Sequence, residues 1–382
     1  THRHSSAASD VYKRQVGVLS FNGNKIVTSG GGGAILTDNN LIAKNARSLT
    51  QVSKIPHEWK FNYKDFQVDA DLTSINGEKT DKKRVSNEIE AKQIENELTS
   101  QSFYLKEIES KPQSNSSKAP FRTSTLQQAA SSKLSFTADR TMRVAQKLYE
   151  DGLITYLRTD GISISNDILN DLRNFISKEY GEKYLSEKPK IYKSKAANSQ
   201  EAHEPIRPTD FSIKPSKAKL TGDEMKLYSL IWNRTLASQM SNSKYERKTL
   251  VISSKDEKYI FRAASRKNLF LGFELLTKEE DEDGTATEFP ENLKEQEELI
   301  LKVINFEQKF TSPPRRYSEA SLIKKMEEEG IGRPSTYASI LKNLREKKYT
   351  YGAKSITPSD LGRVLSSYLK FIFKDFFIED KF

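Results

Sequence analysis

The spacing of the apolar residues changes three times along this 382-residue chain. It favours β-strands at 66–72, 102–110, 248–253, 259–264 and 299–306. Between the second and third of these strands it becomes helical, over 124–132, 138–149, 166–180 and 223–240. Helical spacing returns over 318–382, with one turn or hairpin at 349–356. These changes predict a multidomain α+β protein, in which one helical block is inserted into a β-rich block and a second helical block follows.

Two absences narrow the class of protein further. The chain contains no cysteine, which excludes disulfides, zinc ribbons and cysteine nucleophiles and is compatible with a reducing cytoplasm. No stretch approaches the ~18 consecutive apolar residues of a membrane-spanning helix, and the N-terminus lacks the apolar core of a secretory signal. We therefore expect no membrane partner.

The chain carries an excess of positive charge. Lys and Arg number 62 against 52 Asp and Glu, which gives a formal net charge of +10 at pH 7. Such an excess favours an anionic partner, and nucleic acid is the commonest one. Charge alone leaves open the alternative of a soluble protein that merely carries surplus lysine.

The N-terminal segments differ in character from the rest of the chain. Residues 1–15 show no periodicity, and HSSAASDVYKRQ resembles translated sequencing-adapter sequence, so we predict that they belong to no folded domain. The segment 16–64 contains SFNGNKIVTSGGGGAILTDNNLIAKNARSLT, which resembles the middle of a DegT-type pyridoxal-phosphate-dependent sugar aminotransferase. The resemblance implies that Lys25 forms the Schiff base with pyridoxal phosphate, whereas spacing alone favours a surface residue in a hairpin. Because the resemblance covers only this short segment, we expect an inactive fragment.

The first of four polar motifs is LITYLRTDG, at 153–161. In a strand, Tyr156 and Arg158 would point to the same face, because side chains alternate. A phenol is protonated at neutral pH and is a weak nucleophile, but a guanidinium beside it favours the phenolate and neutralises a phosphate oxygen. The pair therefore suits attack on a phosphodiester. A strand tyrosine packed beside a surface arginine is the alternative.

The second motif is AHEPIRPTD, at 202–210. It places His203 and Arg207 among carboxylates, next to two prolines that forbid a long helix. His203 could donate a hydrogen bond to a phosphate or to a leaving oxygen. A loop histidine without such a role is the alternative.

The third motif is PFRTSTLQQ, at 120–128, and it predicts the start of a helix capped by hydroxyls. The polar residues concerned are Thr123, Ser124, Thr125 and Gln128. Free amide groups and hydroxyls at a helix N-terminus can form a seat for a phosphate. Plain capping is the commoner use of such residues.

The fourth motif combines RYSEAS, at 316–321, with GIGRPSTYAS, at 330–339. It predicts two helices joined by a glycine turn, and the second helix starts near Arg333, Ser335, Thr336 and Tyr337. Arginine and hydroxyls in this position can grip backbone phosphates without reading bases. An ordinary capped helical hairpin on the surface is the alternative.

Together and in this order, PFRTSTLQQAAS, GLITYLRTDG, AHEPIRPTD and YSEASLIKKMEEEGIGRPSTYASIL resemble the signatures of the type IA DNA topoisomerases, in the bacterial topoisomerase I branch. The resemblance covers 65–382. It implies that Tyr156 cuts one DNA strand and becomes linked to its 5′ phosphate, that Arg158 holds the scissile phosphate, and that His203 contacts DNA near the cut. It implies DNA-binding roles for Thr123, Ser124, Thr125, Gln128, Thr159, Asp160, Arg207, Arg333, Ser335, Thr336 and Tyr337. Thr159 and Asp160 would also support the tyrosine loop, and the last four residues would line a groove for the single strand.

The resemblance also implies a fold, a partial torus. A β-rich arch would comprise 65–116 and 244–312, the helical domain that carries the tyrosine 117–243, and a partial helical DNA-binding domain 313–382. Swinging the arch would open a gate for passage of the other strand. The implied partner is single-stranded or negatively supercoiled DNA, and the implied protein is a cytoplasmic, nucleoid-associated monomer.

The metal site of the family is the part that this sequence does not match. The resemblance implies Mg²⁺ held by an N-terminal Toprim domain with a glutamate and an Asp-x-Asp-x-Glu cluster. Asp69 and Asp71 form Asp-x-Asp, but Thr73 follows, and the acidic run 279–283 is far from Tyr156 in the sequence, so we assign no metal ligand. We expect that this chain alone does not relax supercoiled DNA. The alternatives are a single-stranded DNA-binding module without turnover and an aminotransferase.

Overall fold

The structure is a computed structural model of the chain. It describes residues 57–80, 88–192, 203–277, 288–306 and 314–373, and the backbone of an antiparallel hairpin formed by β1 (Gly17–Ser20) and β2 (Gly33–Leu36). Residues 1–15 and Lys25 lie outside the described residues. The predictions made for them, including the aminotransferase resemblance, therefore stay predictions.

The chain divides into two compact units, which we describe in turn. Unit 1 consists of Thr1–Glu109, Thr249–Ala264 and Phe289–Pro313, and unit 2 of Ser110–Lys248, Ser265–Glu288 and Pro314–Phe382. The mixture of a β-rich part and helical parts confirms the predicted α+β class.

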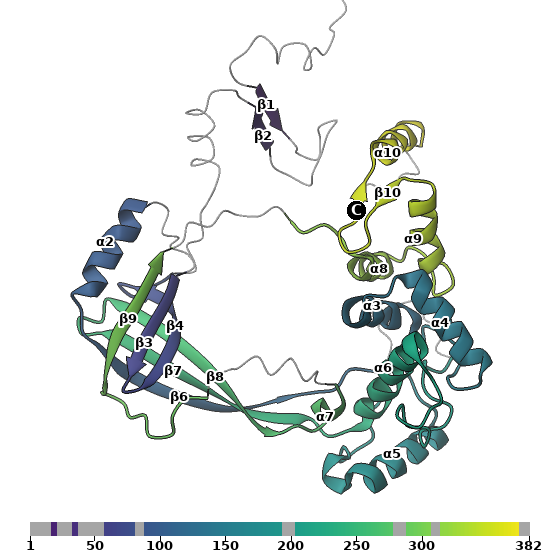
Figure 1. Cartoon of the computed structure of the whole chain (residues 1–382), viewed down its shortest axis with the longest axis horizontal. Coiled ribbons are helices and arrows are strands. Elements are labelled where there is room, and N and C mark those ends of the chain that lie inside the picture. Colours follow the sequence, from purple (N-terminus) through teal and green to yellow (C-terminus); the bar gives the residue numbers. More distant parts are fainter. Residues whose placement is uncertain are drawn as a thin grey trace, which may run out of the picture. The chain divides into compact units, whose positions relative to one another are not determined.

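A seven-stranded sheet forms the β-rich part (Figure 1). Its strands are β3 (His57–Tyr63), β4 (Phe66–Ile75), β5 (Glu78–Lys79), β6 (Phe103–Asn115), β7 (Ser243–Ser254), β8 (Tyr259–Phe270) and β9 (Glu298–Phe306). They lie in the order β3-β9-β6-β7-β8-β4-β5, and β3 also pairs with β4. All strands except the short β5 are therefore linked in a ring, although β6 pairs with β9 only at Phe103 and Tyr104.

The core of unit 1 is aromatic. The ring of Phe61 lies 5.2 Å from that of Phe103 and 5.1 Å from that of Phe261, and Trp59 lies 5.2 Å from Phe261, all in edge-to-face geometry. All four side chains are buried. Helix α2 (Glu88–Thr99) adds Leu98 and other apolar side chains to the same core. Edge-to-face pairs of this kind stabilise a core beyond the area that they bury.

Strand β3 corrects the predicted end of the N-terminal segment. Its residues Trp59, Phe61 and Tyr63 are buried in the core of unit 1, and the strand pairs with both β4 and β9. Residues 57–63 therefore belong to the β-rich part, and the predicted boundary at residue 64 was wrong. Strand β6 also runs to Asn115, five residues beyond the predicted end of this strand at residue 110.

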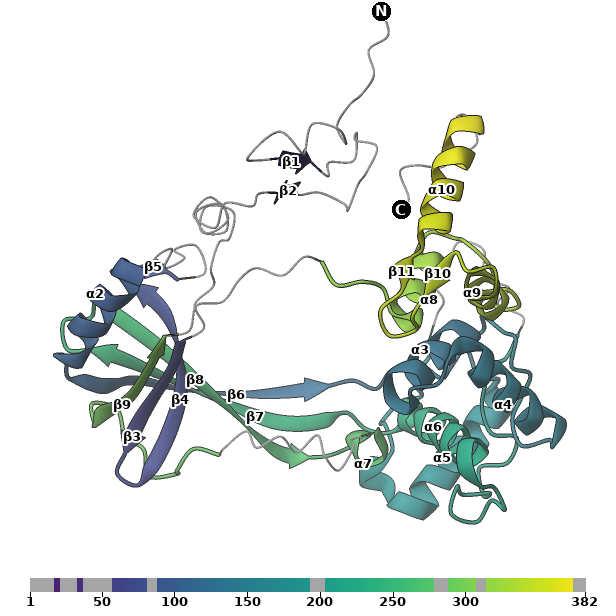
Figure 2. The same ribbon diagram turned by 45° about the horizontal axis from the view of Figure 1, so that its top comes forward.

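Unit 2 contains the helices that surround the polar motifs. They are α3 (Thr123–Leu134), α4 (Ala138–Glu150), α5 (Asn166–Tyr180), the 3₁₀ turn η1 (Glu182–Tyr184), α6 (Gly222–Gln239), α7 (Glu274–Thr277), α8 (Glu319–Glu328), α9 (Tyr337–Glu346) and α10 (Asp360–Ile372). The hairpin of β10 (Thr350–Tyr351) and β11 (Thr357–Pro358) follows α9, where the sequence predicted a turn or hairpin. Figure 2 shows α3, α4, α5 and α6 gathered together.

The first core of unit 2 surrounds α6, which is buried along most of its length. Leu227, Ile231 and Leu236 of this helix are fully buried, and the Trp232 indole donates a hydrogen bond to the Phe211 carbonyl oxygen at 3.1 Å. Burial of this many apolar side chains on one helix fixes it as the centre of the tyrosine-bearing part.

A second, smaller core joins α8 and α9 to the start of α4. Ile323 and Met326 of α8 pack with Tyr337 and Leu341 of α9 and with Ala138 at the start of α4. The predicted domains 117–243 and 313–382 thus contribute to one compact unit.

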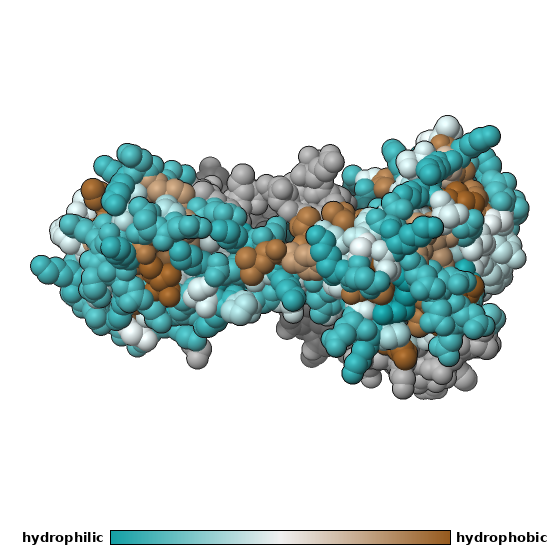
Figure 3. Space-filling view, turned by 90° about the horizontal axis from the view of Figure 1, so that it is seen from below, coloured by the Kyte–Doolittle hydropathy of each residue, from teal (hydrophilic) through white to brown (hydrophobic). Residues whose placement is uncertain are grey.

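The surface is largely polar, as the charged composition requires. The face shown in Figure 3 is mostly hydrophilic over the described residues. Among those residues, no helix combines the length and the apolar character needed to span a membrane.

Candidate active site

Three of the four motifs meet in unit 2 through backbone hydrogen bonds. The Thr155 amide donates to the Arg207 carbonyl oxygen at 2.9 Å, and the Thr209 amide donates to that of Leu153 at 3.1 Å. The Ile206 amide donates in turn to the Phe121 carbonyl oxygen at 2.7 Å. The second motif is therefore held between the first and the third.

The tyrosine segment does not form the predicted strand, because its backbone bends at Thr155 and again at Leu157 and Arg158. Only Ile154 forms a bridge, to Pro208. Burial still alternates, because Leu157 and Thr159 are buried while Tyr156 and Arg158 are exposed. The tyrosine side chain is 49% exposed and is therefore accessible to a large substrate.

The neighbouring Tyr149 of α4 supports the Tyr156 ring. The two ring centroids are 5.6 Å apart, in edge-to-face geometry. Such a contact restricts the rotation of the phenol while it leaves the ring accessible.

Thr123, at the first turn of α3, clamps the tyrosine segment. Its hydroxyl donates to the Leu157 carbonyl oxygen at 2.7 Å and lies 3.0 Å from that of Thr159, and it accepts from the Thr159 amide at 2.9 Å. Arg158 lies between the two clamped residues. Thr123 is fully buried, so the structure places it beneath the loop rather than at the DNA contact that the sequence predicted.

Close packing brings His203 to the same loop. A Cβ atom at Gly161 would lie 1.7 Å from the His203 carbonyl oxygen, so only glycine fits. Thr159 extends the link, since its hydroxyl donates to the Glu204 carbonyl oxygen at 2.9 Å and accepts from the Gly161 amide at 3.0 Å. The His203 side chain itself is exposed, as a role on a substrate requires.

Arg207 is buried, although the sequence predicted that it contacts DNA. Its side chain is buried, donates to Glu204 Oε2 at 2.7 Å and to the Pro208 carbonyl oxygen at 2.9 Å, and is only 6% exposed. A guanidinium held in this way braces the second motif from inside and does not present its charge to solvent.

The hydroxyls of the third motif are also used within the protein. The Ser124 hydroxyl donates to Glu327 Oε1 at 2.6 Å, and the Thr125 hydroxyl accepts from the Arg122 amide at 3.1 Å. Ser124 is buried, and Thr125 and Gln128 are half-buried. Capping, the alternative to a phosphate seat, is therefore what the structure shows for Thr125, whereas the Ser124 hydroxyl binds the side chains of Glu327 and Arg122.

The fourth motif leaves three of its predicted residues at the surface. Arg333, Ser335 and Thr336 are exposed, and the turn before them uses Gly330 and Gly332 at φ values of +70° and +79°. The Thr336 hydroxyl accepts from the Arg333 amide at 2.8 Å, which fixes the turn.

Tyr337 differs from its three neighbours. It is only 5% exposed, and burial raises the pKa of its phenol. The predicted DNA contact by this side chain is therefore replaced by a place in the core of α8 and α9.

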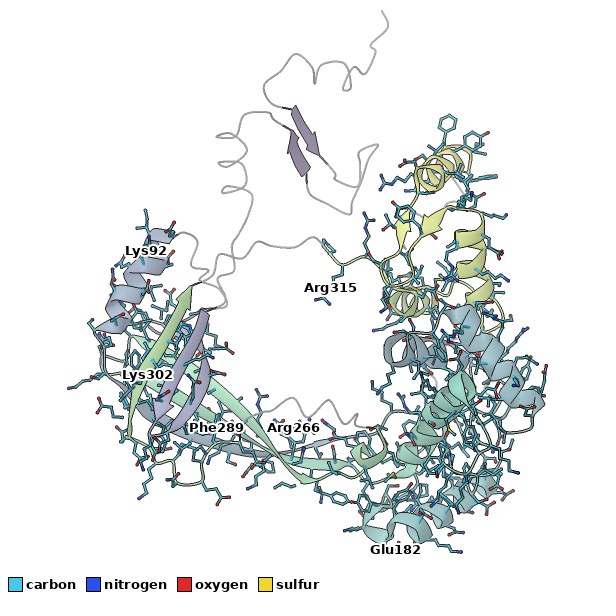
Figure 4. All side chains as sticks on the ribbon, viewed as in Figure 1. Lys92, Glu182, Arg266, Phe289, Lys302 and Arg315 are labelled. Carbon is cyan, nitrogen blue, oxygen red and sulfur yellow. The ribbon has the colours of Figure 1, made fainter. Side chains whose placement is uncertain are left out.

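Several functional candidates were missed by sequence reasoning. Arg315 and Arg316, which precede α8, are exposed, and Figure 4 marks Arg315 on the segment before that helix. Arg122 and Glu327 form an ion pair at 2.9 Å that links α3 to α8. The basic doublet, whose Arg316 begins the RYSEAS motif, could have been found from the sequence, whereas nothing in the spacing joins residues 122 and 327.

The structure offers no metal centre near these residues. Within the described ranges, no three His, Asp or Glu side chains lie close enough together to hold a metal ion. Asp69 and Asp71 are exposed on β4 in unit 1, and Asp69 lies 4.0 Å from Lys60. The acidic run at 279–283 lies outside the described residues.

Comparison with known proteins identifies the family. A family model described as DNA topoisomerase matches residues 53–381. DNA topoisomerase 1 of Rickettsia bellii is 47% identical over 320 residues, which cover 80% of this chain and 40% of that protein. DNA topoisomerase 1 of Zymomonas mobilis is 40% identical over 311 residues, which cover 79% of this chain and 25% of that protein.

A solved structure agrees with these relatives. Full-length topoisomerase I from Thermotoga maritima superposes with a TM-score of 0.69 at 35% sequence identity, and the match covers 88% of this chain and 54% of that one. The chain spans about two fifths of the length of the Rickettsia relatives. It belongs to the DNA topoisomerase family and is a core of the type IA class.

Proposed function

We propose that this chain binds single-stranded DNA and that Tyr156 cleaves it by transesterification, as the nucleophile-bearing part of a topoisomerase. The observation that carries the proposal is the exposure of Tyr156 and Arg158 on a loop in which residues 157 and 159 are buried and held by Thr123. A loop that only packed a tyrosine against the core would have no reason to expose both groups.

In the proposed step, one phosphodiester bond is exchanged for another. The Tyr156 oxygen attacks phosphorus, the bond from phosphorus to the 3′ oxygen of the upstream nucleotide breaks, and the phenolic proton goes to that leaving oxygen by way of solvent. Arg158 neutralises the charge that grows on the phosphoryl oxygens. Reversal of the same step reseals the strand, because the phosphotyrosine keeps an ester of similar energy.

The proposed DNA surface comprises those exposed polar groups of unit 2 that belong to the sequence motifs or directly precede α8. Beside Arg158 and His203, these are Arg315, Arg316, Arg333, Ser335 and Thr336. Cations and hydroxyls at the surface of irregular segments suit the backbone phosphates of a flexible strand. The proposed site of action is accordingly the chromosomal DNA of a bacterial cytoplasm, with the chain acting as a monomer.

The Mg²⁺ expected from the family does not fit the residues described. No group of three suitable ligands exists among them, and the exposed Asp69 and Asp71 belong to unit 1. We therefore assign no step to a metal ion.

The test uses a DNA substrate whose leaving group departs without being protonated. A labelled single-stranded oligonucleotide with sulfur in place of the bridging 3′ oxygen has a thiolate leaving group, which departs without protonation. We expect the chain to form a denaturant-stable adduct with this substrate, and Tyr156→Phe to abolish it. Tyr149→Phe, which removes the other hydroxyl of the ring pair, is the matched control and keeps the adduct.

The same assay distinguishes cleavage from the competing function, which is DNA binding without cleavage. Salt-dependent binding of the oligonucleotide without any adduct would make the chain a single-stranded DNA-binding module without turnover. An adduct that persists in Tyr156→Phe would assign the chemistry to another residue.

A further inference from the structure

We infer that Glu327, on α8, is a positioning residue for the tyrosine loop, although the two lie far apart in the sequence. The inference rests on the proposed function only for the role of the tyrosine loop, which is to present Tyr156 to DNA. The path runs from Glu327 to the first turn of α3, and from that turn to the residues on either side of Arg158.

The first half of the path is a three-way contact at Glu327. Its Oε2 atom lies 2.9 Å from the Arg122 guanidinium, and its Oε1 atom accepts from the Ser124 hydroxyl at 2.6 Å. The Arg122 Nε atom also donates to the Ser124 hydroxyl at 3.1 Å. The carboxylate and the guanidinium are 22% and 23% exposed, so these charge-assisted bonds are largely shielded from solvent.

The second half of the path begins at Thr123, which lies between Arg122 and Ser124 in the sequence. Thr123 holds Leu157 and Thr159 through its hydroxyl, and its own amide donates to the Thr159 carbonyl oxygen at 2.9 Å. Residues 122, 123 and 124 therefore grip α8 and the tyrosine loop from one helical turn. The first turn of a helix lacks internal partners for its amides and frays most readily, so its order depends on such contacts.

Helix α8 is held in place by a second carboxylate, which is buried, and it therefore gives Glu327 a fixed position. Glu319, eight residues before Glu327, is 2% exposed; it accepts from the Ala138 amide at 2.7 Å and pairs with Arg345 at 2.7 Å. Residues eight apart lie on nearly the same face of a helix. Two carboxylates on one face of α8 thus tie it to the starts of α3 and α4.

The arrangement connects two parts of the proposed DNA surface. Helix α8 leads directly into the glycine turn that presents Arg333 and Ser335. Docking of α8 on α3 therefore makes the order of the Tyr156 loop depend on the element that carries those groups.

Amide hydrogen exchange of the full chain, without DNA, tests the inference. The reporters are the Thr159 amide, bound to the Thr123 hydroxyl, and the Gly161 amide, bound to the Thr159 hydroxyl. We expect Glu327→Gln to speed their exchange about tenfold, the effect of losing one charge-assisted bond. Glu328→Gln is the matched control, since that neighbouring carboxylate is 54% exposed and lies 3.8 Å from Lys324; it leaves both rates unchanged.

Two further variants make the outcome decisive. The exchanged pair Arg122→Glu with Glu327→Arg restores an ion pair and is expected to recover most of the protection. Unchanged rates in Glu327→Gln would overturn the inference, and so would a rise that extends equally to Ile231 in the buried α6, which would indicate general unfolding. Because no DNA is present, these results stand apart from those of the adduct assay.

Discussion

Thr123 and Thr159 are bound to each other in both directions. The Thr159 amide donates to the Thr123 hydroxyl at 2.9 Å, and the Thr123 amide donates to the Thr159 carbonyl oxygen at 2.9 Å. Both residues are buried, and neither is near the other in the sequence. This pair fixes the end of the loop that exposes Tyr156 and Arg158, and it is the basis for the first prediction.

Thr123→Val keeps the shape of the side chain and removes its hydroxyl. The Thr159 amide and the Leu157 carbonyl oxygen then lose their buried partner, which we expect to cost about 1–3 kcal/mol of stability. Thermal unfolding measures this loss, and adduct formation with the thiolate-leaving oligonucleotide should slow as well. Thr123→Ser retains the hydroxyl and should restore the adduct rate; equal slowing in both variants would contradict the clamp.

Gly161→Ala should separate the tyrosine loop from the second motif. The added Cβ would lie 1.7 Å from the His203 carbonyl oxygen, so backbone must move. The control is Gly152→Ala, where nothing lies within 4 Å and φ is +71°, so that only the conformational cost of about 1 kcal/mol applies. Chemical denaturation should show the larger loss for Gly161→Ala, and equal losses would refute the close approach.

Unit 1 should lose stability in acid through Glu97. Hydrogen bonds from Lys258 and from the Tyr259 hydroxyl lower the pKa of this carboxyl to about 2. A lowered pKa means that the ionised form stabilises the fold above the ordinary value of 4.5 and that this stability is lost as the pH falls from there towards 2. Because Glu97 is 31% exposed, we expect a contribution of about 1 kcal/mol.

The fluorescence of Trp59, buried in unit 1, reports this transition once the other tryptophan is changed by Trp232→Phe. In that background, Glu97→Gln should flatten the dependence of stability on pH between 4.5 and 2. Glu95→Gln, on the same helix, is the control and should behave like the parent. If the stability of the Trp232→Phe parent does not change between pH 4.5 and 2, the interaction of Glu97 with Lys258 and Tyr259 does not stabilise the fold.

Arg333→Ala should weaken DNA binding in a manner that depends on salt. If the exposed guanidinium contacts one phosphate, its loss reduces the slope of log K against log salt by about 1. Fluorescence anisotropy of a labelled single strand at several salt concentrations gives that slope. Lys178→Ala, which removes an exposed cation from α5, is the control; the same change of slope in both would mean that binding follows net charge alone.

Much of the fold could be predicted from spacing, because most elements bury one regular face. Helix α5 occupies the predicted range 166–180, and α3, α4 and α6 differ from prediction by at most two residues at either end. Strand β3 was missed although Trp59, Phe61 and Tyr63 alternate with polar residues, because the aminotransferase resemblance was extended across it.

The candidate site was predicted only in part, because sequence patterns do not distinguish an exposed polar group from a buried one. Tyr156, Arg158 and Arg333 are exposed as expected, whereas Thr123, Arg207 and Tyr337 turn inward. Thr123 binds the tyrosine loop and Tyr337 packs with Ala138, in both cases far away in the sequence, and such contacts arise only when the chain folds. The Arg207 guanidinium instead binds its near neighbours Glu204 and Pro208.

Mass spectrometry of the trapped complex identifies the residue that attacks the DNA strand. After reaction with the 3′-thio oligonucleotide and digestion of protein and DNA, the account predicts that a 5′-phosphonucleotide remains on the peptide that contains Tyr156, and that the released strand ends in a 3′ thiol. A nucleotide found on any other residue, or a complete absence of adduct while the chain binds the strand, would contradict it.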